Sequence, residues 1–174
     1  DVYILDGNST DDTLAIAKEF NIPFYKQYDT EEKNISIKNF TELRTKADGL
    51  SKYDWIFLLD SDEYVSKELV HDVRRILEGN PDVKTMYFAL KKMVLGDKVI
   101  EHTFNDSPYV ARLYAMQSGI SWKASKTVHE KLYVPDDVTV VKLHHAAYSH
   151  GEPTYREAVK KDDYYLSLVR QKMF

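Results

Sequence analysis

The chain contains no cysteine, and it has only six glycines and five prolines among its 174 residues. The absence of cysteine excludes disulfides, thiolate nucleophiles and cysteine-ligated metals. It also fits a reducing compartment, so a cytoplasmic location is expected. No apolar run approaches the roughly 20 residues that span a bilayer, and no basic segment with an apolar signal core stands at the amino end. Peripheral association with a membrane stays open.

The chain also lacks an excess of basic charge. Lys and Arg number 24 against 28 Asp and Glu, which gives a formal net charge of -4. Such a chain supplies no basic field for nucleic acid, although its cations can still make local phosphate contacts. The length suits one domain, and no repeat or linker divides the sequence, so residues 1–174 are expected to form a single domain.

Short apolar segments alternate with amphipathic ones, which predicts an α/β fold. Helices are expected at Thr13–Phe20, Asn39–Ser51 and Lys67–Glu78, with Ser9 to Asp12 capping the first. Ile120–Tyr133 shows no regular pattern. The tail Thr154–Phe174 has helical spacing and is expected to pack as a terminal helix, with a lid over the site or a homodimer contact as alternatives. Strands are expected at Val2–Leu5, Asn21–Tyr25, Trp55–Leu59, Thr85–Met93, Lys98–His102, Val110–Ala115 and Val138–Leu143.

The most informative segment is the apolar run Trp55–Leu59, which ends in Asp60, Asp62 and Glu63. An unbroken apolar run suits a central strand, and ligands of open α/β sheets gather at the carboxyl ends of such strands. In an extended segment alternate side chains share a side, so Asp60 and Asp62 can turn toward one ligand, most simply a divalent cation. Carboxylates without cysteine favour Mg²⁺ or Mn²⁺, with substrate phosphates completing the shell. The alternative is a strand that ends in a solvated acidic turn.

Three ordered motifs resemble the nucleotide-sugar glycosyltransferases of family 2, which have the GT-A fold. Asp6–Thr13 resembles the family's Asp-x-x-Ser-x-Asp-x-Thr turn, and Phe40–Ala47 resembles its Phe-x-x-x-Arg-Asn-x-Ala helix. Asp60–Glu63 resembles its Asp-x-Asp-Glu element. A later set of residues is similar to a subgroup with lipopolysaccharide-core sugar transferases and peptide S-glycosyltransferases: Arg112, Trp122, Val128, His129, Glu130 and His145.

The resemblance covers nearly the whole chain and implies a three-layer α/β/α fold with a mostly parallel central sheet. It also implies that a strand and a helix that precede Val2 in the family are missing here, and Thr45 stands where the family usually has Asn. The implied activity is a metal-dependent, inverting transfer of a sugar. The donor would be a nucleoside diphosphate sugar, most consistent with a UDP-linked one, and the acceptor a hydroxyl or other nucleophile of a glycan, a lipid-linked molecule or a peptide.

Four residues are implied to bind the nucleotide: Asp6, Arg44, Asp60 and Ser61. Asp6 would accept a hydrogen bond from a uracil-type base, with helix capping as the alternative. Arg44 would approach the same nucleotide, or else pair with a nearby acid on the helix surface. Asp60 would lie near the ribose and the metal.

The metal ligands implied by the resemblance are Asp62, which would bind the ion directly, Asp60, and His145, which matches a late histidine of the subgroup. The alternative for His145 is a buried, hydrogen-bonded histidine. Inversion needs a base for the acceptor proton, and Glu130 is the candidate, with a structural salt bridge to Arg112 as its rival. His129 is the second candidate, as a base, a diphosphate donor or a core histidine.

Two other functions are weighed against the transferase. The first is a nucleotide-sugar-binding domain without turnover. The second is a haloacid-dehalogenase-like phosphatase, whose nucleophilic aspartate also ends an apolar strand in Asp-x-Asp. That class usually continues with a small or hydroxyl residue where this chain has Tyr64, and it does not explain the turn Asp6–Thr13.

Overall fold

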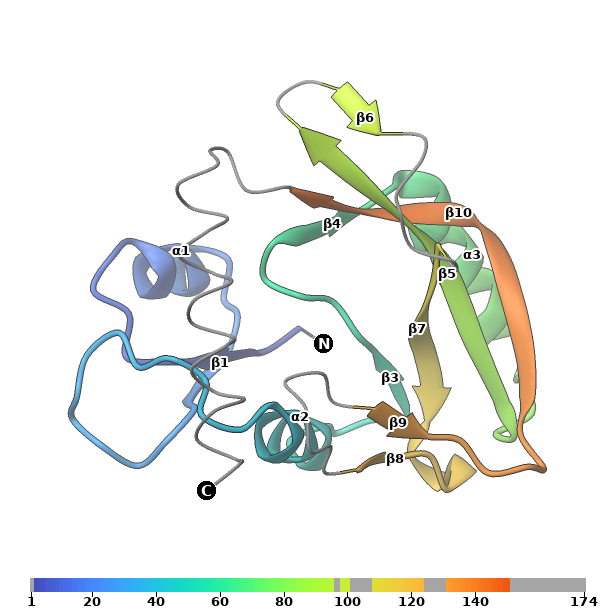
Figure 1. The fold of residues 1–174 in the computed structure, drawn as a ribbon, viewed down its shortest axis with the longest axis horizontal. Coiled ribbons are helices and arrows are strands. Elements are labelled where there is room, and N and C mark those ends of the chain that lie inside the picture. Colours follow the sequence, from blue (N-terminus) through green and yellow to red (C-terminus); the bar gives the residue numbers. More distant parts are fainter. Residues whose placement is uncertain (1, 96–97, 101–107, 124–130, 151–174) are drawn as a thin grey trace, which may run out of the picture.

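The computed structural model describes residues 2–95, 98–100, 108–123 and 131–150, and these form three sheets and three α-helices (Figure 1). The helices are α1 (Thr13–Glu19), α2 (Phe40–Gly49) and α3 (Lys67–Glu78), and a 3₁₀ turn spans Met116–Ser118. The strands are β1 (Ile4–Asp6), β2 (Phe24–Lys26), β3 (Trp55–Phe57), β4 (Glu63–Val65), β5 (Thr85–Leu95), β6 (Lys98–Ile100), β7 (Tyr109–Ala115), β8 (Ser121–Lys123), β9 (Lys131–Tyr133) and β10 (Thr139–His150).

The largest sheet has the order β3-β7-β5-β10-β4, with β6 paired to β5. Strands β5 and β10 run parallel, as do β1 and β2 in a separate sheet, and the other described pairings are antiparallel. The α/β class is confirmed. The family resemblance implied a mostly parallel central sheet, and the parallel pairings among the described residues are β5 with β10 and β1 with β2. Strands β4, β6 and β7 join β10 or β5 through antiparallel ladders.

Helix α3 packs against one face of this sheet (Figure 1). Its N-cap Ser66 accepts a hydrogen bond from the backbone N–H of Leu69 at 3.1 Å, and Gly79 follows its last residue. Leu69 is fully buried among apolar side chains of the sheet. The core on this side consists of Leu69, Tyr87, Ala89, Leu113, Leu143 and Ala147, with Val65, Val73 and Ile76 packed around it.

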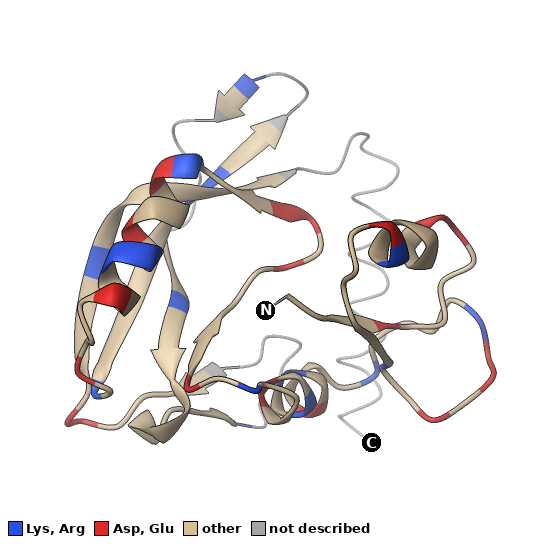
Figure 2. Cartoon of the chain, turned by 180° about the vertical axis from the view of Figure 1, so that it is seen from behind, with Lys and Arg blue, Asp and Glu red and all other residues tan. Residues whose placement is uncertain are grey.

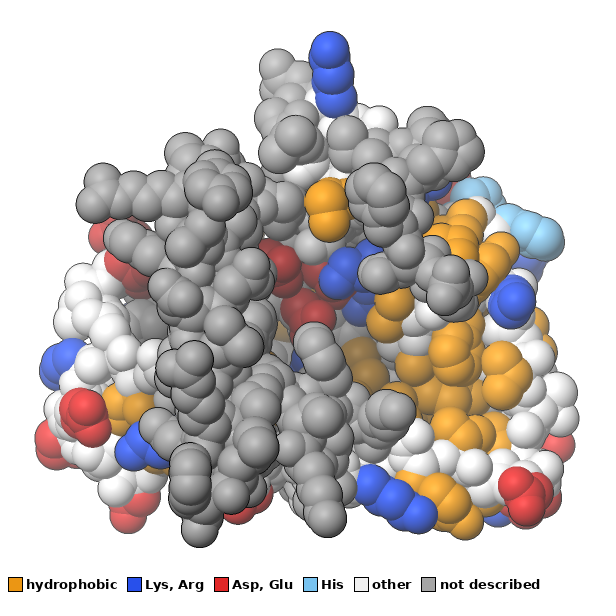
Figure 3. All heavy atoms as spheres, in the orientation of Figure 1, with side chains coloured by type: hydrophobic (Ala, Val, Ile, Leu, Met, Phe, Trp, Pro, Cys, Tyr) orange, Lys and Arg blue, Asp and Glu red, His pale blue; other side chains and the backbone are white. Residues whose placement is uncertain are grey.

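The opposite face of the sheet carries a second core, which the segment around β8 and β9 covers in part. Its buried members are Ile56, Met86, Tyr114 and Ile120, and Leu132 and Val134 pack against them. Figure 3 shows apolar side chains on this face over β5 and β10. The alternation of β5 therefore sends successive side chains to two different cores.

The small β1–β2 sheet, with α1, forms the other half of the molecule (Figure 1). Its turn at Gly7 and Asn8 is tied to the long loop before α2. Asn8 has a positive φ of 60° and donates from Nδ2 to the carbonyls of Thr30 and Glu32. A Cβ on Gly7 would lie 2.6 Å from the carbonyl oxygen of Ile35, so only glycine allows this approach of the two backbones.

Several boundaries differ from the expected ones. Segment Ile120–Tyr133, expected to be irregular, contains β8 and β9. The last strand continues to His150 instead of ending at Leu143, because a bulge between Lys142 and Ala146 lets pairing with β5 resume. The first helix begins at Thr13 as expected and ends at Glu19, one residue early, and Asp11 within the expected capping segment accepts the backbone N–H of Thr13. The turn at 96–97 and the tail at 154–174 lie outside the described residues.

Candidate functional site

The acidic turn, defined here as Asp60–Glu63, connects β3 to β4 and faces the half of the molecule that holds β1 and α1 (Figure 2). Asp60, Ser61 and Asp62 are exposed or partly exposed, whereas the side chain of Glu63 is fully buried. In Figure 3 acidic side chains lie beside basic ones in a hollow near the middle of the molecule. The structure therefore separates the carboxylates by role, with two on the surface and one below it.

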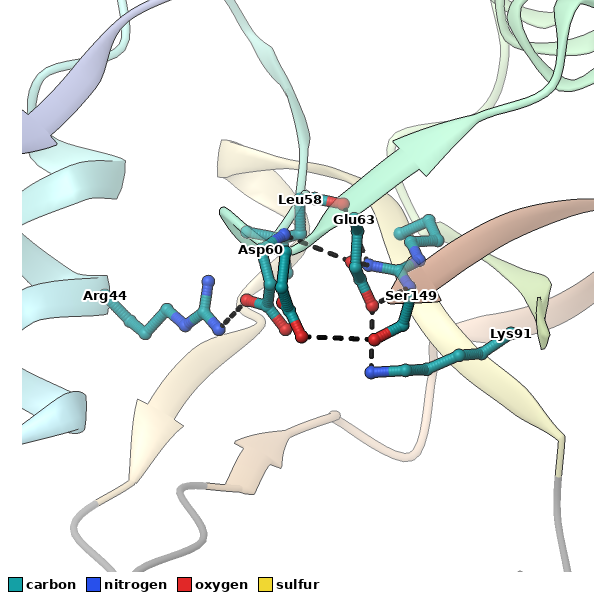
Figure 4. A network of polar contacts seen from close by, with 8 residues as sticks. Arg44, Leu58, Asp60, Glu63, Lys91 and Ser149 are labelled. Atoms are coloured by element: carbon teal, nitrogen blue, oxygen red, sulfur yellow. Dashed lines mark hydrogen bonds and ion pairs between the residues drawn. The ribbon is translucent and has the colours of Figure 1, made fainter. Parts of the chain in front are cut away.

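Glu63 anchors the turn from beneath. Its carboxylate accepts two hydrogen bonds from Arg112, at 2.6 and 2.8 Å, and pairs with the Lys91 ammonium at 2.9 Å. It also accepts the backbone N–H of Asp60 at 3.1 Å, which closes the turn on itself (Figure 4). Burial alone would raise the pKa of Glu63, but the hydrogen bonds from Arg112 and Lys91 outweigh it and lower the pKa to about 2. Glu63 is therefore ionised and fixed.

Arg112 reaches Glu63 because β7 carries an extra residue. Leu113 pairs with Tyr87 and Ala111 with Phe88, so Arg112 stands unpaired in a bulge between them. Bulges re-aim side chains, and here the guanidinium, with its side chain 2% exposed, also donates to the carbonyl of Leu58 at 3.2 Å. Bidentate geometry makes the pair with Glu63 a strong one.

Arg44 and Ser149 hold the two outer carboxylates. The guanidinium of Arg44 on α2 pairs with Asp60, and the hydroxyl of Ser149 on β10 donates to Asp62 at 3.1 Å (Figure 4). The side chain of Asp60 keeps 40% of its area exposed. Both acids thus stay available to a ligand while one carboxylate oxygen of each is positioned.

A half-buried carboxylate, Asp48, supports the Arg44 side of the site. It accepts hydrogen bonds from the Tyr114 hydroxyl at 2.8 Å and from Nε1 of Trp122 at 3.0 Å. Trp122 in turn lies under the guanidinium of Arg44, 5.5 Å from ring centre to Cζ. Burial raises the pKa of Asp48, although hydrogen bonds from Tyr114 and Trp122 and the charge of Arg44 act the other way. Asp48 fixes Trp122, and Trp122 orients Arg44.

Asp6 lies at the end of β1 and is buried. Its two carboxylate oxygens accept from the hydroxyl of Ser9 at 2.6 Å and from the Ser9 backbone N–H at 3.0 Å. Helix α1 begins four residues after Ser9, so Asp6 closes the preceding turn and does not cap the helix. An open hollow of about 400 Å³ adjoins this turn and is lined by Gly7, Ser9, Gln27, Asn34, Ile35, Ser36, Ile37 and Phe40.

His145 lies apart from the acidic turn. Its Nδ1 is 2.6 Å from the carboxylate of Asp72 on α3, and its side chain is 45% exposed. On β10 it stands four residues before Ser149, the residue that reaches Asp62. The pairing with Asp72 thus holds His145 beside α3, and the structure gives no support to it as a metal ligand shared with Asp60 and Asp62. The alternative of a buried histidine is not supported either, because the side chain is partly exposed.

Sequence reasoning singled out Asp60, Asp62 and Arg44, which the structure brings together, but it missed Lys91, Asp48 and Ser149. Glu130 and His129 lie in 124–130, outside the described residues, so the base remains a prediction. A salt bridge between Arg112 and Glu130 was the alternative to a catalytic Glu130. Within the described residues Arg112 pairs with Glu63.

The described residues contain no group of three Asp, Glu, His or Cys side chains able to hold a metal ion. Asp60 and Asp62 alone still suit Mg²⁺ or Mn²⁺, because such ions are commonly held by one or two carboxylates together with substrate phosphates. Glu63 does not compete, since its carboxylate is buried and its oxygens are occupied by Arg112 and Lys91. Two outward carboxylates on a fixed turn are thus a chemically sufficient donor set.

Solved structures with a similar fold define the class. TarS of S. aureus, residues 1–349 in complex with UDP-GlcNAc, aligns with 91% of this chain and 51% of its own at a TM-score of 0.59 and 18% identity. The complex of the same protein with UDP aligns with 99% of this chain and 55% of its own, with a TM-score of 0.54 and 16% identity. The domain has the GT-A glycosyltransferase fold.

The family follows from the sequence match. Glycosyl transferase family 2 matches residues 1–91, and the chain belongs to that family. It is 24% identical over 191 residues to an uncharacterized glycosyltransferase of Rickettsia felis and 23% identical over 180 residues to one of Rickettsia conorii. The alignments cover 98% and 95% of this chain but only 62% and 58% of those proteins. This assignment argues against the phosphatase alternative.

Proposed function

We propose that this chain forms the donor-binding part of a glycosyltransferase that moves a sugar from a nucleoside diphosphate sugar to an acceptor nucleophile. The observation that carries the proposal is the arrangement of the acidic turn. Asp60 and Asp62 face outward, while the buried pair of Glu63 and Arg112 fixes the backbone beneath them. A preorganised acidic turn at the carboxyl end of a sheet strand suits a metal-bound diphosphate.

The donor is proposed to be UDP-linked. Family membership supports a nucleotide sugar, and the similar TarS structures contain UDP-GlcNAc and UDP. In this proposal Asp6 binds the base, and Arg44 and Asp60 lie along the nucleotide, with Ser61 exposed beside them. Asp62 and Asp60 hold Mn²⁺ or Mg²⁺, which would neutralise negative charge on the diphosphate when bound.

The acceptor step is proposed to be an inverting attack. Glu130 would take the acceptor proton, with His129 as the second candidate, and a glycan, a lipid-linked molecule or a peptide would supply the nucleophile. The described residues contain no helix with the length and apolar character needed to cross a membrane. A cell-envelope glycan is the product class we favour.

Thermal unfolding with nucleotides tests the donor site. We expect UDP and UDP-sugars to raise the melting temperature of this chain when Mn²⁺ is present, because ligand at 100 times its Kd adds about 2.7 kcal/mol of stability. Asp62→Ala should abolish the metal-dependent part of that shift. Asp136→Ala, an exposed acid in the turn before β10, is the matched control and should keep it.

Release of UDP separates an enzyme from a binding domain. A chain that is stabilised by UDP-sugar but never releases UDP, with any acceptor or with water, would support the domain without turnover. Absence of stabilisation by every nucleotide tried, with or without metal, would refute the proposed donor site.

A further inference from the structure

Lys91 occupies a position for which neither the family match nor the sequence motifs provide a role. It stands on β5 opposite Ala147 of β10, while Ser149 of β10 stands opposite Glu63 of β4. Residues two apart on a strand share a face, so Lys91, Ser149 and Glu63 meet on one side of the sheet. In Figure 4 a dashed line joins the Lys91 ammonium to the carboxylate of Glu63. Glu63 directly follows Asp62 in the chain, and Ser149, which stands opposite Glu63, donates to Asp62 at 3.1 Å, so Lys91 is bound to the same turn as that carboxylate.

The pair of Glu63 and Arg112 does not need Lys91 for charge balance. Arg112 binds both carboxylate oxygens and is buried with them, so that pair is neutral by itself. The Lys91 side chain is 36% exposed, in contrast with 0% for Glu63 and 2% for Arg112. An ammonium has three donors, and the contact with Glu63 at 2.9 Å orients it while using one of them. Lys91 therefore presents a surplus positive charge at the surface of the site.

The balance of charges in the network indicates which kind of ligand the positive charge of Lys91 would suit. Within the network of Figure 4, Asp60 is matched by Arg44 and Glu63 by Arg112, which leaves Asp62 and Lys91 as the remaining opposite charges of that network. A divalent cation on the outer acids would make this network positive by two charges with Lys91 and by one without it. A nucleoside diphosphate carries more than one negative charge, so Lys91 brings the site closer to neutrality when that ligand is bound.

We propose that Lys91 binds the diphosphate group of the nucleotide, with Glu63 acting to aim its ammonium. The inference rests on the proposed function and adds a binding residue to it. Lysine is well suited to this task, because it meets phosphate oxygens as a compact point charge. The chemistry recognised is the diphosphate, not the base or the ribose.

Titration calorimetry with uridine, UMP and UDP in the presence of Mn²⁺ tests the proposal on the whole chain. Lys91→Met should weaken UDP binding by roughly 10- to 100-fold, the range for a lost hydrogen bond to a charged group, and leave uridine binding unchanged. Lys91→Arg should restore most of the affinity for UDP. Lys92→Met is the matched control, because Lys92 lies on the opposite face of β5, beside Tyr148, and it should bind UDP as the unchanged chain does.

Three results would overturn the inference. Equal UDP affinity in Lys91→Met and the unchanged chain would remove Lys91 from the site while leaving the proposed function intact. A parallel loss of uridine and UDP affinity in Lys91→Met, with a lower melting temperature, would make Lys91 a structural residue only. Failure of the unchanged chain to bind UDP would refute the proposed function, and the inference with it.

Discussion

Replacing Glu63 by Gln tests how the acidic turn is held. The pKa of this carboxyl falls from 4.5 to about 2 on folding, chiefly because Arg112 and Lys91 stabilise its ionised form. Since each pKa unit corresponds to about 1.4 kcal/mol, the ionised side chain contributes on the order of a few kcal/mol to the free energy of unfolding. Because the folded pKa is depressed, this contribution is complete above pH 4.5 and disappears as pH falls toward 2. At pH 7 we expect Glu63→Gln to cost about 3–5 kcal/mol, since it leaves Arg112 buried without a counter-charge.

Urea unfolding of both proteins between pH 7 and pH 3 measures this effect. The unchanged chain should lose more stability than Glu63→Gln as pH falls below 4.5, so the two curves converge. Parallel curves across that range would refute the argument. Glu31→Gln is the control, because its ion pair with Lys26 is exposed and should matter little.

A double-mutant cycle adds a second criterion. Arg112→Met leaves Glu63 with Lys91 alone, and combining it with Glu63→Gln removes both buried charges. We expect the double variant to cost less than the sum of the two single variants, because each single change strands a charge that the other removes. Strict additivity would mean that the pair is not coupled as its geometry indicates.

Two further predictions concern a close backbone approach and a half-buried acid. Gly7→Ala should destabilise the chain by about 1–3 kcal/mol, since its Cβ would lie 2.6 Å from the carbonyl oxygen of Ile35. Gly49→Ala is the control, because a Cβ there would meet nothing within 4 Å, and it should be neutral or stabilising in the same urea titration. Asp48→Asn should remove a decline in the free energy of unfolding that occurs as pH rises. The raised pKa of Asp48 favours its protonated form on folding, so its contribution to stability is complete below pH 3.8 and is lost as pH passes the pKa of the folded state. Urea unfolding at pH 4 and pH 7 measures this difference.

The elements with strong local signals were predictable. Helix α3 has the bounds expected from its amphipathic spacing and from the Gly79 that follows it, and the structure adds Ser66 as its N-cap. The acidic turn was also predictable, because it ends an apolar run. The three-residue strand β4 was not, since so short a segment has no periodicity of its own and is a strand only through its pairing with β10.

The supporting residues of the site depended on contacts that no local pattern encodes. Arg112 meets Glu63 across 49 positions of sequence, and only because a bulge in β7 turns it inward. Asp48 looked like an ordinary helix residue, and its burial arises from Tyr114 and Trp122, which lie 66 and 74 positions away. Motifs therefore identified the outward-facing carboxylates and Arg44, whereas the groups that hold them required the structure.

The late position of β10 in the sequence affects the order in which contacts of the acidic turn form during synthesis. Ser149 contacts Asp62 across 87 positions, and β10 supplies the partner strand of both β4 and β5. A ribosome adding about 5–20 residues per second thus exposes the acidic turn several seconds before the strand that braces it is made. Closing so long a loop is slow compared with forming local helices. The contact between Ser149 and Asp62 consequently forms well after the acidic turn has been synthesised, and a stalled chain that ends before β10 would have the pair of Glu63 and Arg112 but not the hydrogen bond to Asp62.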